Sequence, residues 1–379
     1  MIKKLFILFI VYLFHFNFSS TQEIYSNYKY YTKSNIEFKL TKVSEGLNFP
    51  WGITFIDDLN LIVTEKNGRI FKINTQSGKK QLIKHNIKSL KYNGSGQGGL
   101  LDVLYHKDFL YFSYSHDFSI SGEKSGSSTA VARGKLIRDE IVNLEILLIA
   151  KPKSNINKHW GSRLLVHNNH LYASFGERDL GMIAQDPTKH PGSIIRINLD
   201  GSIPKDNPRF QGYKNWLPEI YQIGVRNPQG IALSPNNDIY ISQHGPRGGD
   251  NIGKIVYAGN FGWKDVAWGG KEYYNAKIGE VPFKKKYNEH LITWVPSIGV
   301  GQIAFYEGET FKTWNGDLIV SSLGTGLLLR LNMVENKISK KEIIIDKELD
   351  RIRDFEIDYK GDIYIVPDKE KAFLWKLSK

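Results

Sequence analysis

The feature that most constrains this chain is a strand-turn-strand unit that occurs six times along its 379 residues. Each unit joins a short apolar strand to a second strand through a tight turn, as in IALS-PNND-IYIS, where Pro, Asn and Asp are typical turn residues. First strands end near Phe55, Tyr105, Val166, Leu233, Tyr306 and Ile357, and their partners begin at Leu61, Leu110, Leu171, Ile239, Leu318 and Ile363. Repetition on this scale indicates stacked modules.

A third apolar strand with one basic residue follows each pair, and a fourth strand is expected in every module except the last. The N-terminal segment EFKLTKV, which begins at Glu37, can supply the missing strand. Four antiparallel strands in each of six modules, the last one completed by the N-terminal strand, predict an all-β, six-bladed β-propeller. Closure of the ring leaves no blade edge exposed.

The repeat also predicts the domain organisation. Residues 36–379 are expected to form a single propeller, because no long helical pattern or Ser/Pro-rich linker interrupts the modules. Residues 21–35 are expected to form an N-terminal extension, and residues 1–20 a secretory signal peptide.

The prediction of a signal peptide depends on the order of basic and apolar residues. Lys3 and Lys4 form a basic start, and residues 5–14 form an apolar run. An uncleaved membrane anchor is the alternative, but His15 and Asn17 interrupt the apolar run, which is also short for a membrane span. We therefore expect a periplasmic or secreted protein with no stable membrane insertion after cleavage.

Composition excludes several kinds of site. The chain has no cysteine, so disulfides, thiolate metal sites and a cysteine nucleophile are excluded. The formal net charge is +12 at pH 7, which would suit a nucleic-acid partner. The lysines are scattered through turns and third strands, however, and are not interleaved with aromatic residues on one element. We therefore expect a solvated basic surface and no binding of nucleic acid.

Polar residues are concentrated at one end of the predicted ring. In a propeller, residues just before the first strand of a blade share a rim with residues just after the second strand. The rim residues are Gln97, His159, Arg226, Asn227, Arg351 and Arg353 before first strands, and Glu65, Glu177, the loop 244–250 and Gly324 after second strands.

This rim has the composition of an anion site. Arginine side chains bind carboxylates pairwise and stay charged at any working pH, so a ligand with several carboxylates is expected. Arg226 is also predicted to lie beside the GPRGG loop, whose carbonyls can hold a hard cation. The alternative is that the three arginines form structural ion pairs with Glu177, Asp354 or Asp250.

His159 and Glu177 lie at the two ends of one predicted hairpin. A carboxylate at that position can orient the imidazole ring and raise its basicity, which is the arrangement of a general base. A lone histidine would more often be a packed core residue, so the prediction of a base depends on this pairing.

The order of motifs resembles the family of soluble quinoprotein glucose/sorbosone (aldose sugar) dehydrogenases. The resemblance spans nearly the whole chain after the predicted signal. The motifs that carry it are GLNFPWGITF, GQGGLLDVLYH, HWGSRLLV, the run from AQDP to RINLDGSIPKDNP, PEIYQIGVRNPQGIAL, HGPRGGDNI, GNFGW and RIRDFEID. The resemblance implies a six-bladed propeller that binds pyrroloquinoline quinone and Ca²⁺ and oxidises the C1 hydroxyl of an aldose sugar to a lactone. The electron acceptor is not identified by these motifs.

The resemblance also implies roles for individual residues. His159 resembles the base that takes the substrate proton, and Glu177 resembles the carboxylate that orients it. The residues that resemble cofactor-binding positions are Gln97, Arg226, Asn227, Arg351 and Arg353. Gly245 and Pro246 match the positions whose backbone carbonyls hold Ca²⁺.

Two positions depart from the family pattern. Gly324 stands where glucose-oxidising members have a lysine that binds the quinone, so one cationic contact is missing. Asn251 stands where many relatives have a glutamate, which replaces a charged metal ligand with a neutral one.

Two other classes of function stay open at this stage. A calcium-dependent propeller lactonase would need a cage of Asp, Glu and Asn side chains, whereas this rim is rich in arginine. A non-catalytic propeller that binds a sugar or another partner is the second alternative, because a fold alone does not determine chemistry.

Overall fold

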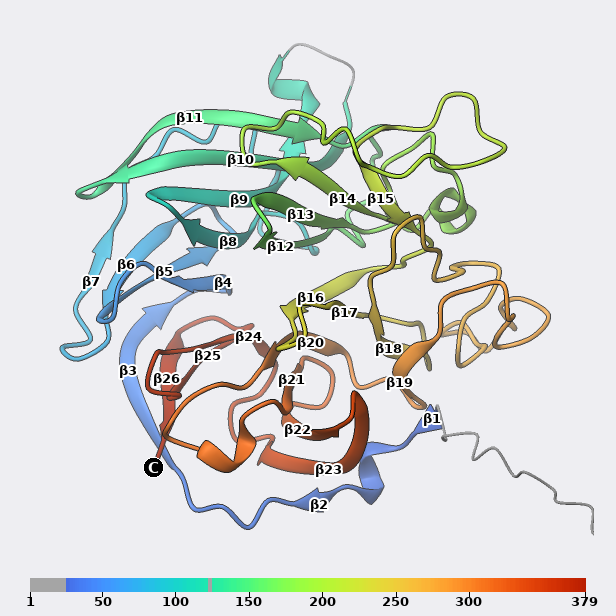
Figure 1. The fold of residues 1–379 in the computed structure, drawn as a ribbon. Coiled ribbons are helices and arrows are strands. Elements are labelled where there is room, and N and C mark those ends of the chain that lie inside the picture. The colour runs from blue at the N-terminus through green and yellow to red at the C-terminus, as the bar shows by residue number, and fades with distance from the viewer. Residues whose placement is uncertain (1–24, 122–124) are drawn as a thin grey trace, which may run out of the picture.

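The computed structural model describes residues 25–121 and 125–379. The predicted signal peptide, residues 1–20, and the beginning of the 21–35 extension lie outside these residues. The described chain forms a ring of six blades, each with four antiparallel strands (Figure 1). The predicted all-β, six-bladed propeller is therefore confirmed.

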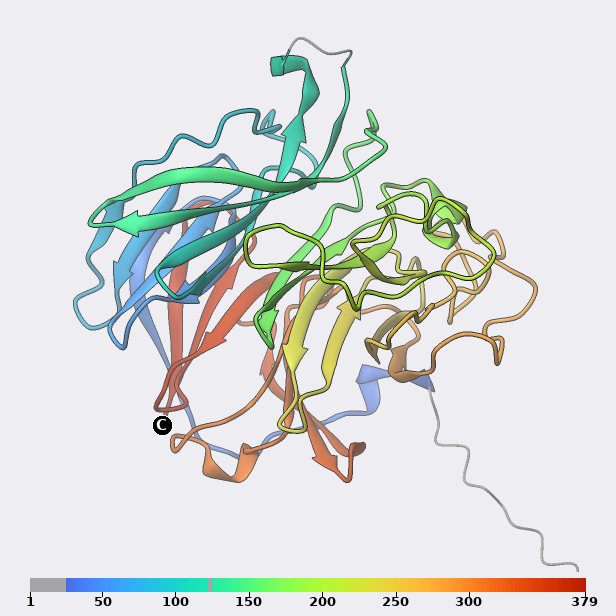
Figure 2. The same ribbon diagram turned by 45° about the horizontal axis from the view of Figure 1, so that its top comes forward.

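Each of the first five blades uses four consecutive strands, ordered from the ring axis outward. They are β4 (Pro50–Phe55), β5 (Asn60–Glu65), β6 (Ile70–Asn74) and β7 (Lys80–Leu82); β8 (Leu100–His106), β9 (Phe109–Asp117), β10 (Ser127–Ile137) and β11 (Glu140–Ile149); β12 (Gly161–His167), β13 (His170–Phe175), β14 (Ser193–Asn198) and β15 (Ile220–Ile223); β16 (Pro228–Leu233), β17 (Ile239–Gln243), β18 (Asp250–Lys254) and β19 (His290–Trp294); β20 (Val300–Phe305), β21 (Leu318–Ser322), β22 (Leu327–Val334) and β23 (Lys337–Asp346). The long hairpin of β10 and β11 is visible in Figure 2.

The last blade joins the two ends of the described chain. It contains β24 (Ile352–Ile357), β25 (Ile363–Pro367), β26 (Ala372–Ser378) and, as its outer strand, β3 (Lys39–Leu47). Leu377 pairs with Leu40 and Ala372 with Leu47, and Figure 1 shows the blue β3 beside the red β26. The prediction that the N-terminal strand completes the last blade is confirmed, and this pairing holds the ring closed.

The residues before β3 cover the outer edges of two blades, which the sequence did not predict. β1 (Tyr25–Ser26) pairs in parallel with β19, and β2 (Thr32–Lys33) pairs in parallel with β23. Between them lies the 3₁₀ helix η1 (Tyr28–Tyr30). Trp294 Nε1 donates to the Tyr31 hydroxyl at 2.8 Å, so this segment is held to β19 by a side chain as well.

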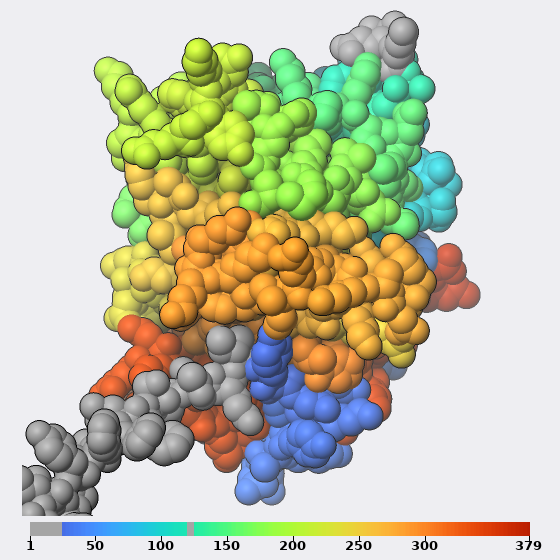
Figure 3. Space-filling model, turned by 90° about the vertical axis from the view of Figure 1, so that its right-hand side faces the viewer, coloured from blue at the N-terminus to red at the C-terminus, as the bar shows by residue number. Residues whose placement is uncertain are grey.

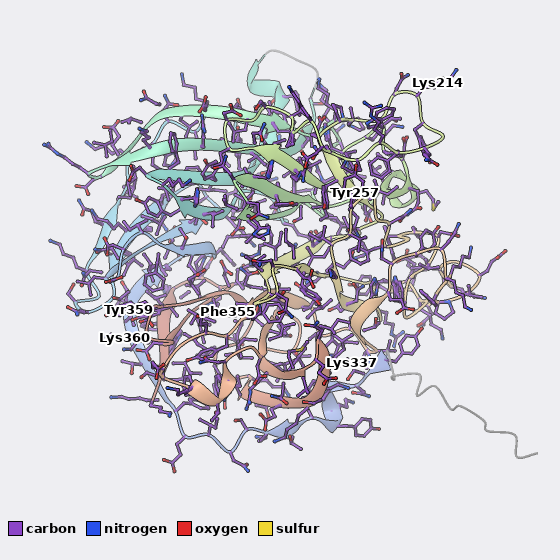
Figure 4. All side chains as sticks on the ribbon, in the orientation of Figure 1. Lys214, Tyr257, Lys337, Phe355, Tyr359 and Lys360 are labelled. Atoms are coloured by element: carbon purple, nitrogen blue, oxygen red, sulfur yellow. The ribbon has the colours of Figure 1, made fainter. Side chains whose placement is uncertain are left out.

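The apolar core lies between the blades rather than along the axis. The six largest buried clusters each combine side chains of two adjacent blades. Phe355 of β24 belongs to one of them and lies toward the middle of the ring, whereas Lys214 lies on an outer loop (Figure 4). Because adjacent blades share a core, the positions of the inner strands, and of the loops at their ends, are fixed relative to one another.

A long segment, residues 255–289, connects β18 to β19 and spreads over one side of the ring (Figure 3). The other helices in the described part of the chain are three short 3₁₀ helices, η2 (Phe118–Ser121), η3 (Gly181–Gln185) and η4 (Lys312–Trp314). Within the described residues, no helix has the length and apolar character needed to cross a bilayer.

Candidate active site

A cavity of about 150 Å³ opens at the end of the ring where the first strands begin. Its lining residues are Trp51, Lys66, Gly96, Gln97, Leu101, Trp160, Gly161, Asn227, Gln229, His244, Leu323, Arg351, Arg353 and Asp368. A larger hollow of about 610 Å³ lies where β20 and β24 end, and its lining includes Glu307, Glu309, Glu356 and Asp358. The acidic lining of the larger hollow opposes binding of an anion, so the cationic cavity is the candidate site despite its smaller volume.

His159 and Glu177 form a buried pair beside this cavity. His159 Nδ1 lies 2.5 Å from Glu177 Oε1, and both residues are largely removed from solvent. The other carboxylate oxygen, Oε2, accepts from the backbone N–H of Gly181 at 2.6 Å. Glu177 therefore holds the ring through Nδ1, which leaves Nε2 for a substrate.

The protonation of His159 suits a base. Burial lowers the pKa of His159 below its usual value, and Arg226 lowers it further, whereas the hydrogen bond to Glu177 raises it. The imidazole is therefore neutral at neutral pH and can accept a proton. His159, Glu177 and Asp179 also offer ligand atoms within 4.8 Å of one another, as in a metal site. The direct bond from Nδ1 to the carboxylate favours an oriented base over a metal ligand, since a metal would displace that bond.

The loop that carries His159 has unusual backbone conformations. His159 has φ of 51° and the buried Ser162 has φ of 99°, in the left-handed region that favours glycine. Two of the predicted cofactor-binding side chains hold this loop. Gln97 Oε1 accepts from the His159 N–H at 2.8 Å, and Asn227 Oδ1 accepts from the Gly161 N–H at 3.1 Å. Strained backbone of this kind persists only where the surroundings support it, and it is common at functional sites.

Arg178 supports the same loop from beneath, and sequence reasoning missed it. Its guanidinium donates to the carbonyls of Lys158 and Ser127 at 2.9 and 3.0 Å, and also to the carbonyl of Ile156. It stacks on Trp160, with the guanidinium carbon 3.4 Å from the ring centroid. Burial lowers the pKa of Arg178 to about 9. Arg178 therefore fixes the loop before His159 through backbone carbonyls.

Arg226 lies against the GPRGG loop, as the hairpin predicted. Its Nη1 donates to the carbonyl of Gly245 at 3.1 Å, and its guanidinium carbon lies 5.1 Å from the Trp263 ring centroid. Asp250 shapes this loop by accepting from the N–H groups of Gly245 and Val300, each at 2.8 Å. The Asp250 carboxylate is thus used by backbone amides and does not pair with Arg226.

The other two arginines converge on Asp368, not on Asp354 as the structural alternative supposed. Arg353 Nη2 lies 2.8 Å and Arg351 Nη2 lies 3.3 Å from Asp368 Oδ2. Lys66 Nζ lies 3.1 Å from the second oxygen, Oδ1. Three cations therefore surround one carboxylate at the cavity wall, and the cationic character predicted for this rim is present in the structure.

Below the cavity, three buried charged residues, Arg163, Asp102 and Asp354, form an ion triad that joins the inner strands of three blades. Arg163 Nη1 lies 3.1 Å from Asp102 Oδ1 and 3.0 Å from Asp354 Oδ1. Arg163 also donates from Nη2 to the carbonyl of Arg353 at 3.1 Å, and its guanidinium carbon lies 4.4 Å from the Trp51 ring centroid. The triad therefore supports both the backbone of Arg353 and a side chain that lines the cavity.

The sequence profile of the family described as Glucose / Sorbosone dehydrogenase matches residues 47–376. The chain belongs to this family. It is 29% identical to the aldose sugar dehydrogenase YliI of Escherichia coli over 354 residues, covering 89% of this chain and 91% of that protein. It is also 30% identical to quinoprotein glucose dehydrogenase B of Acinetobacter calcoaceticus over 254 residues, 59% of this chain and 52% of that protein.

The solved structures agree with the sequence comparison. The soluble aldose sugar dehydrogenase of E. coli in its apo form superposes with a TM-score of 0.84 at 27% identity, covering 90% of this chain and 99% of that chain. A glucose dehydrogenase structure superposes with a TM-score of 0.83 at 28% identity, covering 89% and 99%. The resemblance inferred from the motifs is confirmed, and family membership identifies the chain as an oxidoreductase of the sugar dehydrogenase class.

The structure gives physical reasons for both departures from the family pattern. The Gly324 N–H donates to the carbonyl of Ile298 at 2.9 Å, and a Cβ on Gly324 would lie 2.5 Å from that oxygen. A side chain at this position would therefore require the backbone to move. Asn251 is buried and its amide group bonds within its own hairpin: it accepts from Gln243 Nε2 at 3.1 Å and donates to the Gly249 carbonyl at 2.8 Å.

Replacing Glu177 with glutamine is expected to move the acid limb of the pH–rate profile of this family member to lower pH. The amide oxygen can still accept from Nδ1, but the charge that raises the pKa of His159 is removed. Since the base works when neutral, activity falls as pH drops through its pKa, and a lower pKa shifts that fall downward. A weaker base should also lower kcat, on the order of 10-fold. Profiles of kcat/KM against pH test this, and an unmoved limb would contradict the pairing.

Lys66, Asp368, Arg178 and the Arg163 triad were not predicted as site residues. Lys66 follows β5 and Asp368 follows β25, so the rim rule that selected Glu177 could have found both. Arg178 follows Glu177 directly, but its carbonyl partners lie in irregular loops that no pattern predicts. Arg163 stands in the motif HWGSRLLV, but nothing local in that motif indicates its partners, Asp102 and Asp354, which lie on other blades.

Proposed function

We propose that this protein is a quinoprotein aldose sugar dehydrogenase that oxidises the C1 hydroxyl of its substrate to a lactone. The observation that carries the proposal is the His159–Glu177 pair next to a cavity lined by cations. Proton removal and anion binding at one site are what oxidation of an alcohol with a carboxylate-bearing cofactor requires. The printed names of the relatives, aldose sugar dehydrogenase and quinoprotein glucose dehydrogenase, support the same conclusion.

The donors and charges at the cavity support binding of pyrroloquinoline quinone, which is a tricarboxylate. Arg226 Nε and Arg353 Nε are buried and have no hydrogen-bond partner among the described residues. Three cations share the single carboxylate of Asp368, which leaves a positive excess at the wall. Unpaired buried donors and uncompensated cations are costly unless an anion binds. Gln97, Arg226, Asn227, Arg351 and Arg353 are therefore proposed to hold the cofactor.

When bound, the quinone supplies an acceptor for the hydride that leaves C1 of the sugar. His159 Nε2 takes the proton of the C1 hydroxyl, so that the hydride and proton together convert the alcohol to the lactone carbonyl. Glu177 keeps Nδ1 engaged and stabilises the imidazolium that forms. The loop held by Gln97, Asn227 and Arg178 maintains the position of the base during this transfer. A positioned base of this kind contributes about 10²- to 10⁴-fold in rate.

Gly245 and Pro246 are proposed to hold Ca²⁺ through their backbone carbonyls, in a hard-cation role that polarises the bound cofactor. Carbonyl ligands are neutral, and the nearby Asp250 carboxylate is already used by backbone N–H groups. Arg226 also donates to the Gly245 carbonyl. The negative charge that balances Ca²⁺ must then come from the carboxylates of the cofactor, so we infer that the metal binds together with the quinone.

Export to the periplasm or secretion is inferred from the signal-like residues 1–20. The proposed domains are a signal peptide at residues 1–20, an extension at residues 21–35 and the propeller at residues 36–379. The long segment 255–289 lies beside the site, since Trp263 packs near Arg226, and it is the proposed source of substrate contacts.

The test is a reconstitution assay. Purified protein given pyrroloquinoline quinone, Ca²⁺ and an aldose is expected to reduce an electron-accepting dye, and to lose this activity when either the quinone or Ca²⁺ is omitted. A panel of aldoses would identify the preferred sugar. Binding of the quinone without dye reduction for any sugar would favour the alternative of a non-catalytic binding propeller. Release of acid from a lactone without the quinone would favour the lactonase alternative.

A further inference from the structure

Among the residues that the structure describes, Lys66 is the one lysine that lines the cavity. It directly follows β5, and its backbone is fixed at both ends: its N–H donates to the Phe49 carbonyl at 3.2 Å, and its carbonyl accepts from the Leu100 N–H at 3.0 Å. Its side chain is 10% exposed, and Nζ lies 5.3 Å from the Phe49 ring centroid. A long, charged side chain is thus held in a buried position by its own backbone.

The surroundings of Lys66 do not compensate its charge. Asp368 is the only carboxylate within ion-pair distance among the described residues, and Arg351 and Arg353 already contact it. Burial lowers the pKa of Lys66, and the two arginines lower it further, whereas Asp368 raises it. A structural ion pair with Asp368 would need only one cation, and Arg353 supplies it at 2.8 Å. The third cation is therefore costly to the folded protein unless another anion enters the cavity.

Gly324, the position where the family pattern has a lysine, cannot supply a cation in this protein. A Cβ on Gly324 would lie 2.5 Å from the Ile298 carbonyl oxygen, and a Cβ on Gly299 would lie 2.5 Å from the Gly324 nitrogen. The two backbone segments are in contact, so a lysine at Gly324 requires rearrangement of both. Lys66, on a different blade, already places an ammonium group at the wall of the same cavity.

We propose that Lys66 binds a carboxylate of the quinone cofactor and supplies, from the blade that contains β4 to β7, the cation that Gly324 lacks. This inference rests on the proposed function, because it assumes a tricarboxylate ligand. Arg351 and Arg353 lie at the other side of Asp368, so the ligand is held by cations from two blades that are adjacent in the closed ring.

The experiment compares binding of pyrroloquinoline quinone and of its trimethyl ester by the full chain, measured by calorimetric titration in the presence of Ca²⁺. Lys66→Met is expected to weaken quinone binding by about 10- to 100-fold, the range of a lost hydrogen bond between charged groups. Lys66→Arg should bind within a few-fold of the parent. The ester lacks the carboxylate charges, so its affinity should be nearly the same for the parent and Lys66→Met.

The matched control is Lys369→Met, which removes a neighbouring lysine whose ammonium group pairs with Asp350 at 2.9 Å and whose side chain is 42% exposed. It should leave quinone affinity unchanged. Lys66→Gln takes the place of Lys66→Met if that variant loses its cooperative unfolding transition. Equal quinone affinity in the parent and the Lys66 variant, or equal weakening for quinone and ester, would overturn the inference. Absence of quinone binding by the parent would instead overturn the proposed function.

Discussion

Replacement of His159 with alanine is expected to lower kcat for aldose oxidation by about 10²- to 10⁴-fold while quinone affinity changes little. The imidazole is held by Glu177 at 2.5 Å and is kept neutral by burial and by Arg226. His159 is neutral and is not one of the residues proposed to hold the cofactor carboxylates, so its side chain contributes little to binding an anion. The effect should therefore appear in kcat far more than in the affinity for the quinone.

The measurement is steady-state dye reduction by the reconstituted protein, with quinone affinity determined by titration on the same sample. His167→Ala is the matched control, because His167 ends β12, the strand that begins two residues after His159, and should leave turnover unchanged. Added imidazole should restore part of the activity of His159→Ala if the lost group is a base. Full turnover by His159→Ala would show that another group removes the proton.

The fold was predictable because its signals are local. Each blade begins with a hairpin. The turn of that hairpin requires particular residue types, such as Pro235 and Asn237, and this requirement depends only on the backbone conformation of a few neighbouring residues. The N-terminal strand was predictable by elimination, since only the last module lacked an outer strand. The two-residue strands β1 and β2 were not predicted, because so short a pairing has no periodic pattern.

The site was predictable only for residues whose place next to a strand end puts them on the rim of the ring. His159, Glu177 and Arg226 come together because each stands at the end of an inner or second strand. One alternative left open by the sequence, an ion pair between Arg353 and the adjacent Asp354, is not formed, and the actual partner is Asp368. Successive strand residues point to opposite faces, so Asp354 points to the ring axis and Arg163. Alternation along β24 was sufficient to exclude that pair, but the blade geometry was needed to identify Asp368.

The second large effect is expected from Arg163→Met, which should lower the free energy of unfolding by about 3–5 kcal/mol. Arg163 is fully buried between Asp102 and Asp354, and it also donates to the carbonyls of Gln229 and Arg353. Methionine fills a similar volume but leaves two buried carboxylates facing each other without a cation. The loss of the guanidinium, rather than a cavity, therefore dominates the expected change.

The pH dependence of this loss provides a specific signature. Burial raises the pKa of both Asp102 and Asp354, and Arg163 opposes this rise. Without Arg163 the folded-state pKa values rise further above those of the unfolded chain, so the folded variant binds more protons. Its stability is then lost as pH increases through the raised pKa values. The difference between parent and variant should be larger at pH 8 than at pH 5, as measured by urea unfolding at both pH values.

A triple variant separates charge from packing. Arg163→Met combined with Asp102→Asn and Asp354→Asn removes all three charges but retains oxygens that can accept from the N–H groups of Leu164 and Ile53. Most of the stability lost in the single variant should return, because replacing a whole buried ion cluster with neutral groups is often nearly neutral. A loss in Arg163→Met that is under about 1 kcal/mol, or that is the same at both pH values, would contradict the role of the triad. Since the Arg163 guanidinium also supports the carbonyl of Arg353 and lies against Trp51, the triple variant should recover stability without recovering full quinone affinity.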